Sequence, residues 1–254
     1  MNTKQSEKHA FAISCHTIIP LATLSPRSTI TITNKELIHR LINVLRLNLD
    51  DAFIVFDNHY NAQCTLRHST KKEITISIEA ILKNRIHSPS ITFLLPLLKR
   101  TAFEEALYSL VELGANTIQL LYTQKARSHW TQKDEERAFA IMIAAAEQSK
   151  NFALPALEKP VELSYYLQHL HSNSSYSIFF DAHGTPLATS LESARKEKKP
   201  LCIMVGPEGD CTQEEKKLLN QNSFSFAVLT PTVLRAQQAV ALSMGILRSL
   251  INDP

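Results

Sequence analysis

The segment from Val205 to Asp210 combines residue types that could bind a ligand at the end of a strand. The apolar run 200–205 is typical of a buried parallel strand, and Gly206-Pro207-Glu208-Gly209 follows it directly. Glycine lets the backbone approach a ligand closely, and open α/β sheets bind ligands outside the carboxyl ends of their strands. A tight turn that merely needs glycine is the alternative. Neither GxxxxGK[ST] nor GxGxxG is present, so this is not one of those phosphate-binding loops.

A second segment, Leu229 to Ala239, again lies between a predicted strand and a predicted helix. Its most unusual residue is Arg235, at the start of the helix. A cation there opposes the helix dipole and is unfavourable unless it meets an anion. A solvated surface arginine is the ordinary explanation, but the position next to the first loop favours a functional role.

The elements that must position these loops alternate between strands and helices from residue 91 onward, which predicts an α/β domain with a parallel sheet. Residues 1–85 predict a small, mainly β module with one helix, which begins after Thr33 with capping-box spacing to Glu36. The polar segment 83–90, with its Ser-Pro break, is the expected linker. The expected strands of the second part are 91–96, 117–122, 176–182, 200–205 and 224–229, and the expected helices are 102–113, 132–150, 212–221 and 236–250. Thr212 and Glu215 have capping-box spacing at the start of the third of these helices.

Composition limits the class of protein. Hydrophobic residues make up 44% of the 254 residues and charged residues 20%, which fits a folded globular chain. A net charge of +3 permits a nucleic-acid partner without requiring one. The four cysteines have no CxxC spacing, so we expect reduced, packed thiols and no metal site. We find no signal peptide and no membrane-spanning run, and therefore expect a cytoplasmic protein.

Taken together, the two loops resemble those of the SPOUT methyltransferases. More narrowly, they resemble the family that methylates N3 of a uridine in 16S ribosomal RNA of the small subunit, which typically shows GPEGG and then LGxRILRTETA. Further similarities follow in the family's order and cover nearly the whole chain: His39 to Arg46 with Asp51 resembles H…VLR…GD, Lys99-Arg100 with Glu112-Leu113-Gly114 resembles K…ELG, Arg127-Ser128 resembles RS, and 146–149 with Pro155 resembles A.EQS.R…P.

The resemblance implies a fold and an assembly. It implies a PUA-like RNA-binding β-barrel over residues 1–85 and a SPOUT-type, trefoil-knotted parallel-sheet domain over residues 86–254. The knot is implied by the resemblance alone, and not by any periodicity. The resemblance also implies a homodimer that binds S-adenosylmethionine and acts on 16S rRNA in the small ribosomal subunit.

The resemblance further implies roles for particular residues. Arg235 would stabilise negative charge on the uracil or hold a phosphate, and no residue stands out as the general base. For each basic candidate, a solvated surface side chain is the ordinary alternative. The implied cofactor residues are Asp181, Val205, Gly206, Pro207, Glu208, Gly209, Leu229, Thr230, Val233 and Leu234, and the implied RNA-binding residues are Lys35, His39, Arg46, Lys99, Arg100 and Arg127.

Several positions depart from the family pattern. Asp210 replaces a glycine, Thr230 and Thr232 replace Gly and Arg, and Gln237-Gln238 replaces Glu-Thr. Asn151 stands where Arg is usual and Asp50 where Gly is usual. Two alternatives therefore remain: an RNA-binding relative with impaired catalysis, or a SPOUT methyltransferase that acts on another RNA, such as a tRNA. Trp130 and His129 could stack on a base, although local packing is the expectation for Trp130.

Overall fold

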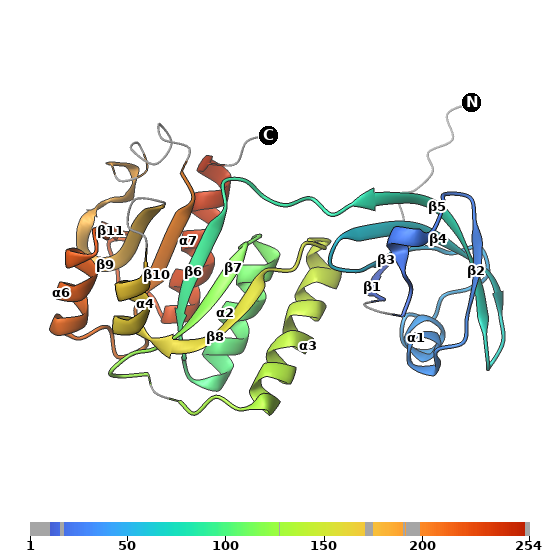
Figure 1. Cartoon of the computed structure of the whole chain (residues 1–254), viewed down its shortest axis with the longest axis horizontal. Coiled ribbons are helices and arrows are strands. Elements are labelled where there is room, and N and C mark those ends of the chain that lie inside the picture. The colour runs from blue at the N-terminus through green and yellow to red at the C-terminus, as the bar shows by residue number, and fades with distance from the viewer. Residues whose placement is uncertain are drawn as a thin grey trace. The chain divides into compact units, whose positions relative to one another are not determined.

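The computed structural model describes residues 11–15, 18–126, 128–170, 175–189, 191 and 199–251. The chain forms two compact units, shown in Figure 1. The first takes in the residues up to Arg85 together with 146–153, and the second takes in the remainder.

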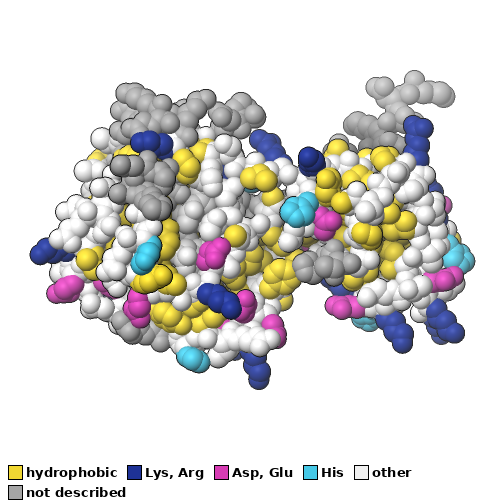
Figure 2. All heavy atoms as spheres, in the orientation of Figure 1, with side chains coloured by type: hydrophobic (Ala, Val, Ile, Leu, Met, Phe, Trp, Pro, Cys, Tyr) yellow, Lys and Arg dark blue, Asp and Glu magenta, His cyan; other side chains and the backbone are white. Residues whose placement is uncertain are grey.

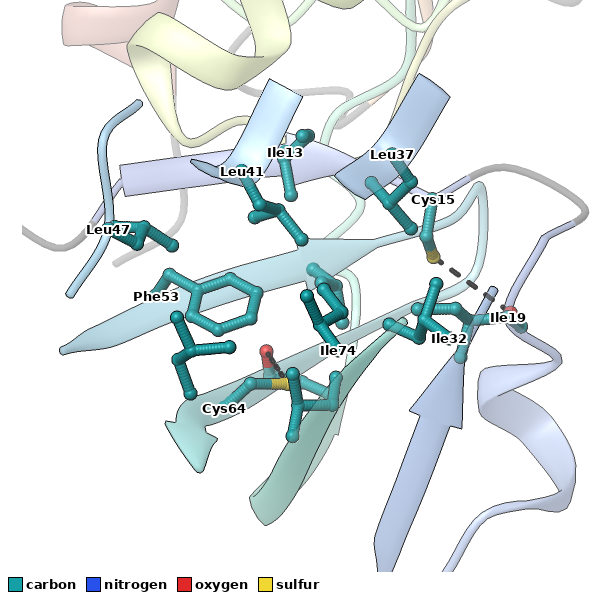
Figure 3. Close-up of a cluster of buried hydrophobic side chains, with 14 of the residues drawn as sticks. Ile13, Cys15, Ile19, Ile32, Leu37, Leu41, Leu47, Phe53, Cys64 and Ile74 are labelled. Atoms are coloured by element: carbon teal, nitrogen blue, oxygen red, sulfur yellow. Dashed lines mark hydrogen bonds between the residues drawn. The ribbon is translucent and has the colours of Figure 1, made fainter. Parts of the chain in front are cut away.

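The first unit is mainly β with one short α-helix, as the sequence predicted, and the described residues form a five-stranded sheet. The strand order is β1-β3-β4-β5-β2, with β1 parallel to β3 and the other neighbours antiparallel. Apolar side chains from the sheet and from α1 form its core, among them Phe53, Ile74 and Leu37 (Figure 3). The elements are β1 Phe11–Ser14, β2 Thr29–Ile32, α1 Lys35–His39, β3 Ala52–Phe56, β4 Tyr60–Ser69 and β5 Ile74–Lys83.

The start of α1 differs from the prediction by one residue. Asn34, and not Thr33, is the N-cap, because its side chain accepts a hydrogen bond of 2.9 Å from the Leu37 N–H. After His39 the backbone continues as a π-helical turn over Arg40–Val44. An asparagine caps a helix as well as a threonine does, so the spacing to Glu36 alone did not decide between them.

A segment far along the chain completes the first unit. Both oxygens of the Glu147 carboxylate accept from Nη2 of Arg40, at 2.7 and 2.8 Å. One of them also accepts a hydrogen bond of 2.9 Å from the Ser14 N–H. The Phe152 ring lies against Phe56, with the ring centroids 4.6 Å apart. The predicted division at residue 85 therefore leaves out the stretch 146–153, which belongs to this unit.

The second unit contains the predicted parallel sheet, in the order β11-β9-β10-β6-β7-β8. Helices α4 and α6 cover one face, where Leu167 and Leu219 join the core with Phe179. Helices α2 and α7 pack against each other (Figure 1). The elements are β6 Ile91–Pro96, α2 Arg100–Glu112, β7 Thr117–Tyr122, α3 Gln132–Ser149, β8 Ala156–Glu162, α4 Leu163–His169, β9 Tyr176–Pro186, β10 Leu201–Val205, α6 Gln213–Gln221, β11 Ser225–Val228 and α7 Ala236–Ile251.

Strand β9 is longer than the predicted 176–182. It continues past Asp181 to Pro186, because β11 pairs with it again after a shift in register. Gly184 makes this possible, since a Cβ there would lie 2.5 Å from the backbone of Ala227. The sequence patterns also gave no prediction for β1, β8 and α4.

The four thiols are free and buried, as expected. Burial raises the pKa of Cys15, Cys64 and Cys202 to about 12, and it raises the pKa of Cys211 as well. All four are therefore protonated at neutral pH and act as small apolar side chains.

Among the described residues of the second unit, Arg248 on α7 is the most deeply buried cation, with 6% of its surface exposed. Its guanidinium donates to the carbonyl oxygens of Gly114 (2.6 Å) and Pro89 (2.7 Å) and to Oδ1 of Asn116 (2.7 Å). Burial lowers its pKa to about 10, so it stays charged at neutral pH. It joins α7 to the segments before β6 and β7.

We expect Arg248→Met to lower the free energy of unfolding by about 3 kcal/mol, because two buried carbonyl groups lose their donor. Urea unfolding followed by circular dichroism measures the change. Lys217→Met, at an exposed position on α6, is the matched control and should change stability by less than about 0.5 kcal/mol. Equal stability of the two variants would contradict the assignment.

Candidate active site

Residues at or beyond the carboxyl ends of the inner strands β9, β10, β6 and β7 lie at one edge of the parallel sheet. Lys99 follows β6, Gln124 follows β7, Asp181 lies on β9, and Gly206 follows β10. The carboxyl ends of parallel strands share an edge, which is where such sheets bind ligands. The fold therefore brings the first predicted loop, Gly206 to Gly209, to a suitable place for a ligand.

The Gly206–Gly209 loop is held from two sides. The Glu208 carboxylate accepts a hydrogen bond of 2.9 Å from the Lys99 N–H, and Nζ of Lys125 donates to the carbonyl of Gly209 at 2.6 Å. Glu208 thus holds the backbone of a neighbouring loop. Val205 and Pro207 are buried, whereas Glu208 and Gly209 are exposed.

Asp210, a departure from the family pattern, fits this loop well. Its φ of 60° lies in the left-handed region, which glycine adopts freely and aspartate tolerates better than most residues. Its Oδ1 accepts the Cys211 N–H at 2.7 Å. A Cβ on Gly206 would approach the same oxygen to 2.9 Å, so a side chain there would require the Asp210 carboxylate to shift.

Glu215 on α6 connects the site to a third loop. The predicted capping box is present: the Thr212 hydroxyl accepts the Glu215 N–H, and the Glu215 carboxylate accepts the Thr212 N–H. The same carboxylate also accepts the Gln124 N–H at 2.7 Å. Sequence reasoning missed this bond, because nothing local links residue 124 to residue 215.

A charge network lies beside the loop. Nζ of Lys216 pairs with Asp181 and, at 2.7 Å, with Asp210. Burial raises the pKa of Asp181, but the hydrogen bonds from Lys216 and the His183 N–H outweigh it, so the pKa falls below its ordinary value. Burial lowers the pKa of Lys216, and its bonds to the two carboxylates outweigh that effect and raise it. Asp181 is therefore a structural anchor within this protein.

The second predicted loop, Leu229 to Arg235, joins β11 to α7. The Leu229, Thr230 and Leu234 side chains are half-buried, and Val233 is 86% exposed. Because β9 separates β11 from β10 in the sheet, this loop and the first one flank the strand that carries Asp181. Adjacent strands lie about 4.8 Å apart, so one ligand can reach all three segments.

Arg235 is exposed and immediately precedes the first residue of α7. Its carbonyl accepts the Ala239 N–H, and its guanidinium has no hydrogen bond or ion pair to any described residue. Of the other departures, Thr232 accepts a bond of 2.6 Å from the Thr230 hydroxyl, whereas Gln238 is exposed on α7.

The predicted RNA-binding cations fall into two groups. Lys35, His39 and Arg46 are exposed on and just after α1 in the first unit, and Lys99 and Arg100 are exposed at the start of α2 in the second. The intervening Arg40 is committed to Glu147. Arg127 lies outside the described residues.

In the part of the chain that the structure describes, no three His, Cys, Asp or Glu side chains are grouped so as to hold a metal ion. No helix there has the length and apolar character needed to cross a membrane.

Comparison with known proteins gives matches over both units. Residues 86–248 match the family model of an RNA methyltransferase domain, and residues 32–79 match that of an RNA methyltransferase PUA domain. The chain is 27% identical to a ribosomal RNA small subunit methyltransferase E from Synechocystis sp., over 89% of this chain and 75% of that protein. The Rickettsia conorii protein of the same name is 26% identical, over 89% and 92%.

Solved structures share the fold. A ribosomal RNA small subunit methyltransferase E from Neisseria gonorrhoeae bound to S-adenosylmethionine superposes with a TM-score of 0.83 at 20% identity, covering 96% of this chain and 99% of that one. A Legionella pneumophila protein in complex with the same cofactor gives 0.80, also at 20% identity, over 96% and 99%. The predicted α/β fold with a PUA-like N-terminal part is confirmed.

We expect Asp181→Asn to lower the free energy of unfolding by about 2 kcal/mol at pH 7, because Lys216 loses its buried partner. The folded-state pKa of Asp181 is lowered, so its contribution is complete above the unfolded pKa of about 3.9 and is lost as pH falls through the folded pKa. The difference from the unsubstituted protein should therefore narrow below about pH 4.

Urea unfolding at pH 7 and at pH 3 measures both differences. Asp210→Asn removes the other carboxylate that pairs with Lys216. The Asp210 side chain is 58% exposed, so this change should lower the free energy of unfolding by less than about 0.5 kcal/mol. A loss for Asp181→Asn that is equal at both pH values would contradict the ionised pair.

Proposed function

Because the chain belongs to the RNA methyltransferase family, whose model matches residues 86–248, we propose that it transfers a methyl group from S-adenosylmethionine to N3 of a uridine in 16S ribosomal RNA of the small subunit. The observation that carries the proposal is the similarity to small subunit methyltransferase E proteins over 89% of the chain. The order of the family motifs in the sequence supports the same uridine position.

The loops at the carboxyl edge of the sheet suit S-adenosylmethionine. Gly206 has no side chain to cover its half-buried backbone, and a Cβ there would displace the Asp210 carboxylate. Leu229 and Leu234 offer partly exposed apolar surface beside polar backbone groups, the usual composition of a cofactor pocket. Thr230, Val233 and the segment Val205–Gly209 complete the proposed pocket, and Asp181 supports it through Lys216.

When bound, S-adenosylmethionine supplies an electrophilic methyl group on its sulfonium. The uracil N3 would release its proton to water as it forms the new bond to the methyl carbon and the carbon–sulfur bond breaks, so negative charge would develop on the neighbouring uracil oxygens. Arg235 carries a cation that no described residue neutralises, at a helix start where an anion is favoured. We assign it the stabilisation of that charge.

The exposed cations Lys35, His39, Arg46, Lys99 and Arg100 are proposed to bind the RNA backbone. Arg127 belongs to the same proposal by its motif. On the face drawn in Figure 2, lysine and arginine side chains are spread over both units and form no single basic patch. Such contacts position an RNA without reading its sequence, which fits recognition of a large, folded RNA by its shape.

The homodimer, the trefoil knot and the cytoplasmic location remain proposals from the family resemblance. One feature supports a partner surface at the site: Val233 is 86% exposed although it is apolar and lies in the proposed cofactor loop. A second copy of the chain that covered this loop would bury Val233.

The cytoplasmic location follows from the proposed substrate, because a methyltransferase of ribosomal RNA meets that RNA in the cytoplasm.

We expect Gly206→Val to weaken S-adenosylmethionine binding by at least about tenfold, because its side chain would occupy the space where backbone meets the ligand. Isothermal titration calorimetry measures the affinity. In the double variant Gly206→Val with Asp210→Ala, the contact with the Asp210 carboxylate is gone. Binding should stay weak there. Its recovery would show that Gly206 serves only the turn.

We expect Arg235→Ala to lower the single-turnover rate by about a hundredfold, the usual cost of removing one group that stabilises transition-state charge. Cofactor affinity should change by less than about threefold. Transfer of labelled methyl groups to small ribosomal subunits that lack the modification measures the rate. An unchanged rate would remove Arg235 from the mechanism.

The unsubstituted protein in the same assay separates the alternatives. Transfer to N3 of a uridine in 16S rRNA supports the proposal, and transfer to a tRNA instead would favour a different substrate. Cofactor or RNA binding without any transfer would favour an RNA-binding relative, as the Gln237-Gln238 departure suggests.

A further inference from the structure

A small cavity of about 130 Å³ lies in the second unit, between the starts of α2 and α3. Its volume is well below the ~300–1,000 Å³ of pockets that enclose whole drug-sized ligands, which restricts an occupant to a single ring. Its apolar walls come from the end of β6, the two helices and the segment before α3: Leu97, Leu98, Phe103, Trp130, Ala138 and Ile141.

Trp130 gives this cavity an aromatic wall. Its ring packs edge to face on Phe103, with the centroids 5.6 Å apart and the planes at 68°. This contact fixes the indole, in agreement with the local packing expected from the sequence. Trp130 is nevertheless only half-buried. It also lines a second, open groove next to Phe139. A fixed, half-exposed indole is suited to stack on another planar group.

A charged group of four side chains borders the same cavity. Arg137 donates twice to Glu104, at 3.0 Å each, and Nε of Arg100 donates to the same carboxylate at 3.2 Å. Those hydrogen bonds, led by the ones from Arg137, lower the pKa of Glu104, so it stays ionised. Asp134 is the second carboxylate and accepts from Thr131.

The charges of this group cancel, with two guanidiniums and two carboxylates. A phosphate would therefore meet no net attraction, whereas a neutral ring with hydrogen-bonding edges would be accepted. Arg100 has its side chain 81% exposed and donates only Nε to Glu104 among the described residues. Both of its terminal nitrogens can donate to such an edge.

The cavity adjoins the proposed cofactor loop. Arg100 follows Lys99, whose N–H is bonded to Glu208 of that loop at 2.9 Å. A group bound in the cavity would lie near the reacting uridine without occupying the loop itself. Phe103 and Arg137 were not among the residues predicted to bind RNA, and for Trp130 base stacking was the alternative to the expected local packing.

We propose that this cavity binds the base of an unpaired RNA nucleotide next to the methylated uridine, stacked on Trp130 and hydrogen-bonded by Arg100. This inference rests on the proposed function, because it takes RNA as the substrate. A single-ring base stacks as on other single-strand binding surfaces, where aromatic side chains contact a base through its flat face. The neighbouring nucleotide is thereby held while the uridine reaches the reacting position.

The experiment uses the full chain and its single tryptophan. Trp130 fluorescence is recorded while a single-stranded RNA oligonucleotide with the sequence around the modified uridine is added, and a mobility-shift assay measures binding independently. We expect saturable quenching with the same dissociation constant in both measurements. A fully base-paired duplex of that sequence should bind without quenching.

Variants then measure the contribution of the stack. Trp130→Ala should weaken RNA binding by about tenfold, within the range measured for one base–aromatic stack. Trp130→Phe should stay within about threefold of the unsubstituted protein. Tyr165→Ala removes another exposed aromatic ring of the second unit, 55% exposed and outside the cavity, and should have no effect. S-adenosylmethionine binding should be equal in all three variants, which checks that they are folded.

Each result has one meaning. RNA that binds and is methylated while Trp130 emission stays constant would overturn this inference and leave the proposed function standing. Unchanged RNA affinity of Trp130→Ala would also overturn it. Quenching of Trp130 by RNA together with weaker RNA binding by Trp130→Ala, but with no methyl transfer by the unsubstituted protein, would support the cavity and overturn the proposed function alone.

Discussion

The buried carboxylate of Glu215 is the interaction on which the arrangement of the site depends. At the carboxyl edge of a parallel sheet the strands have ended, so the backbone N–H groups of the loops lose their ladder partners and need others. Glu215 accepts two of them, from Thr212 at 2.8 Å and from Gln124 at 2.7 Å. One side chain, 5% exposed, thus joins the start of α6 to the loop after β7. Without it, two N–H groups would need other partners, and the loops they anchor would separate.

Glu208 repeats this arrangement one strand away, where it accepts the Lys99 N–H. Lys125 adds a bond in the opposite sense, to the Gly209 carbonyl. The loop is therefore fixed by bonds between side chains and backbone of neighbouring loops. Neither of these bonds involves the side chain of Asp210, so this residue can differ from the family pattern while the loop keeps its anchors.

The parts that sequence reasoning predicted are those with a strong local signal. Strand β10 was predicted because five consecutive apolar residues precede Gly206, and α6 because Thr212 and Glu215 have capping-box spacing. The extension of β9 was missed, since a run containing Gly184 and Pro186 is typical of a turn. Only the partner strand β11, more than forty residues away, holds that run extended.

Long-range partners account for the other differences. The bond from Ser14 to Glu147 spans 133 residues, and the one from Arg248 to Gly114 spans 134. No local pattern encodes such pairs, although an Arg in an apolar helix end and a Glu in an apolar helix could have suggested that each has a buried partner.

The same reasoning applies to the aromatic wall at Trp130. Packing of a tryptophan on a neighbouring ring and binding of a ligand are not exclusive, because one face of an indole can be fixed by Phe103 while another stays exposed. The sequence suggested local packing and base stacking as alternatives for Trp130. The structure gives this residue both a packed neighbour and a cavity that it lines.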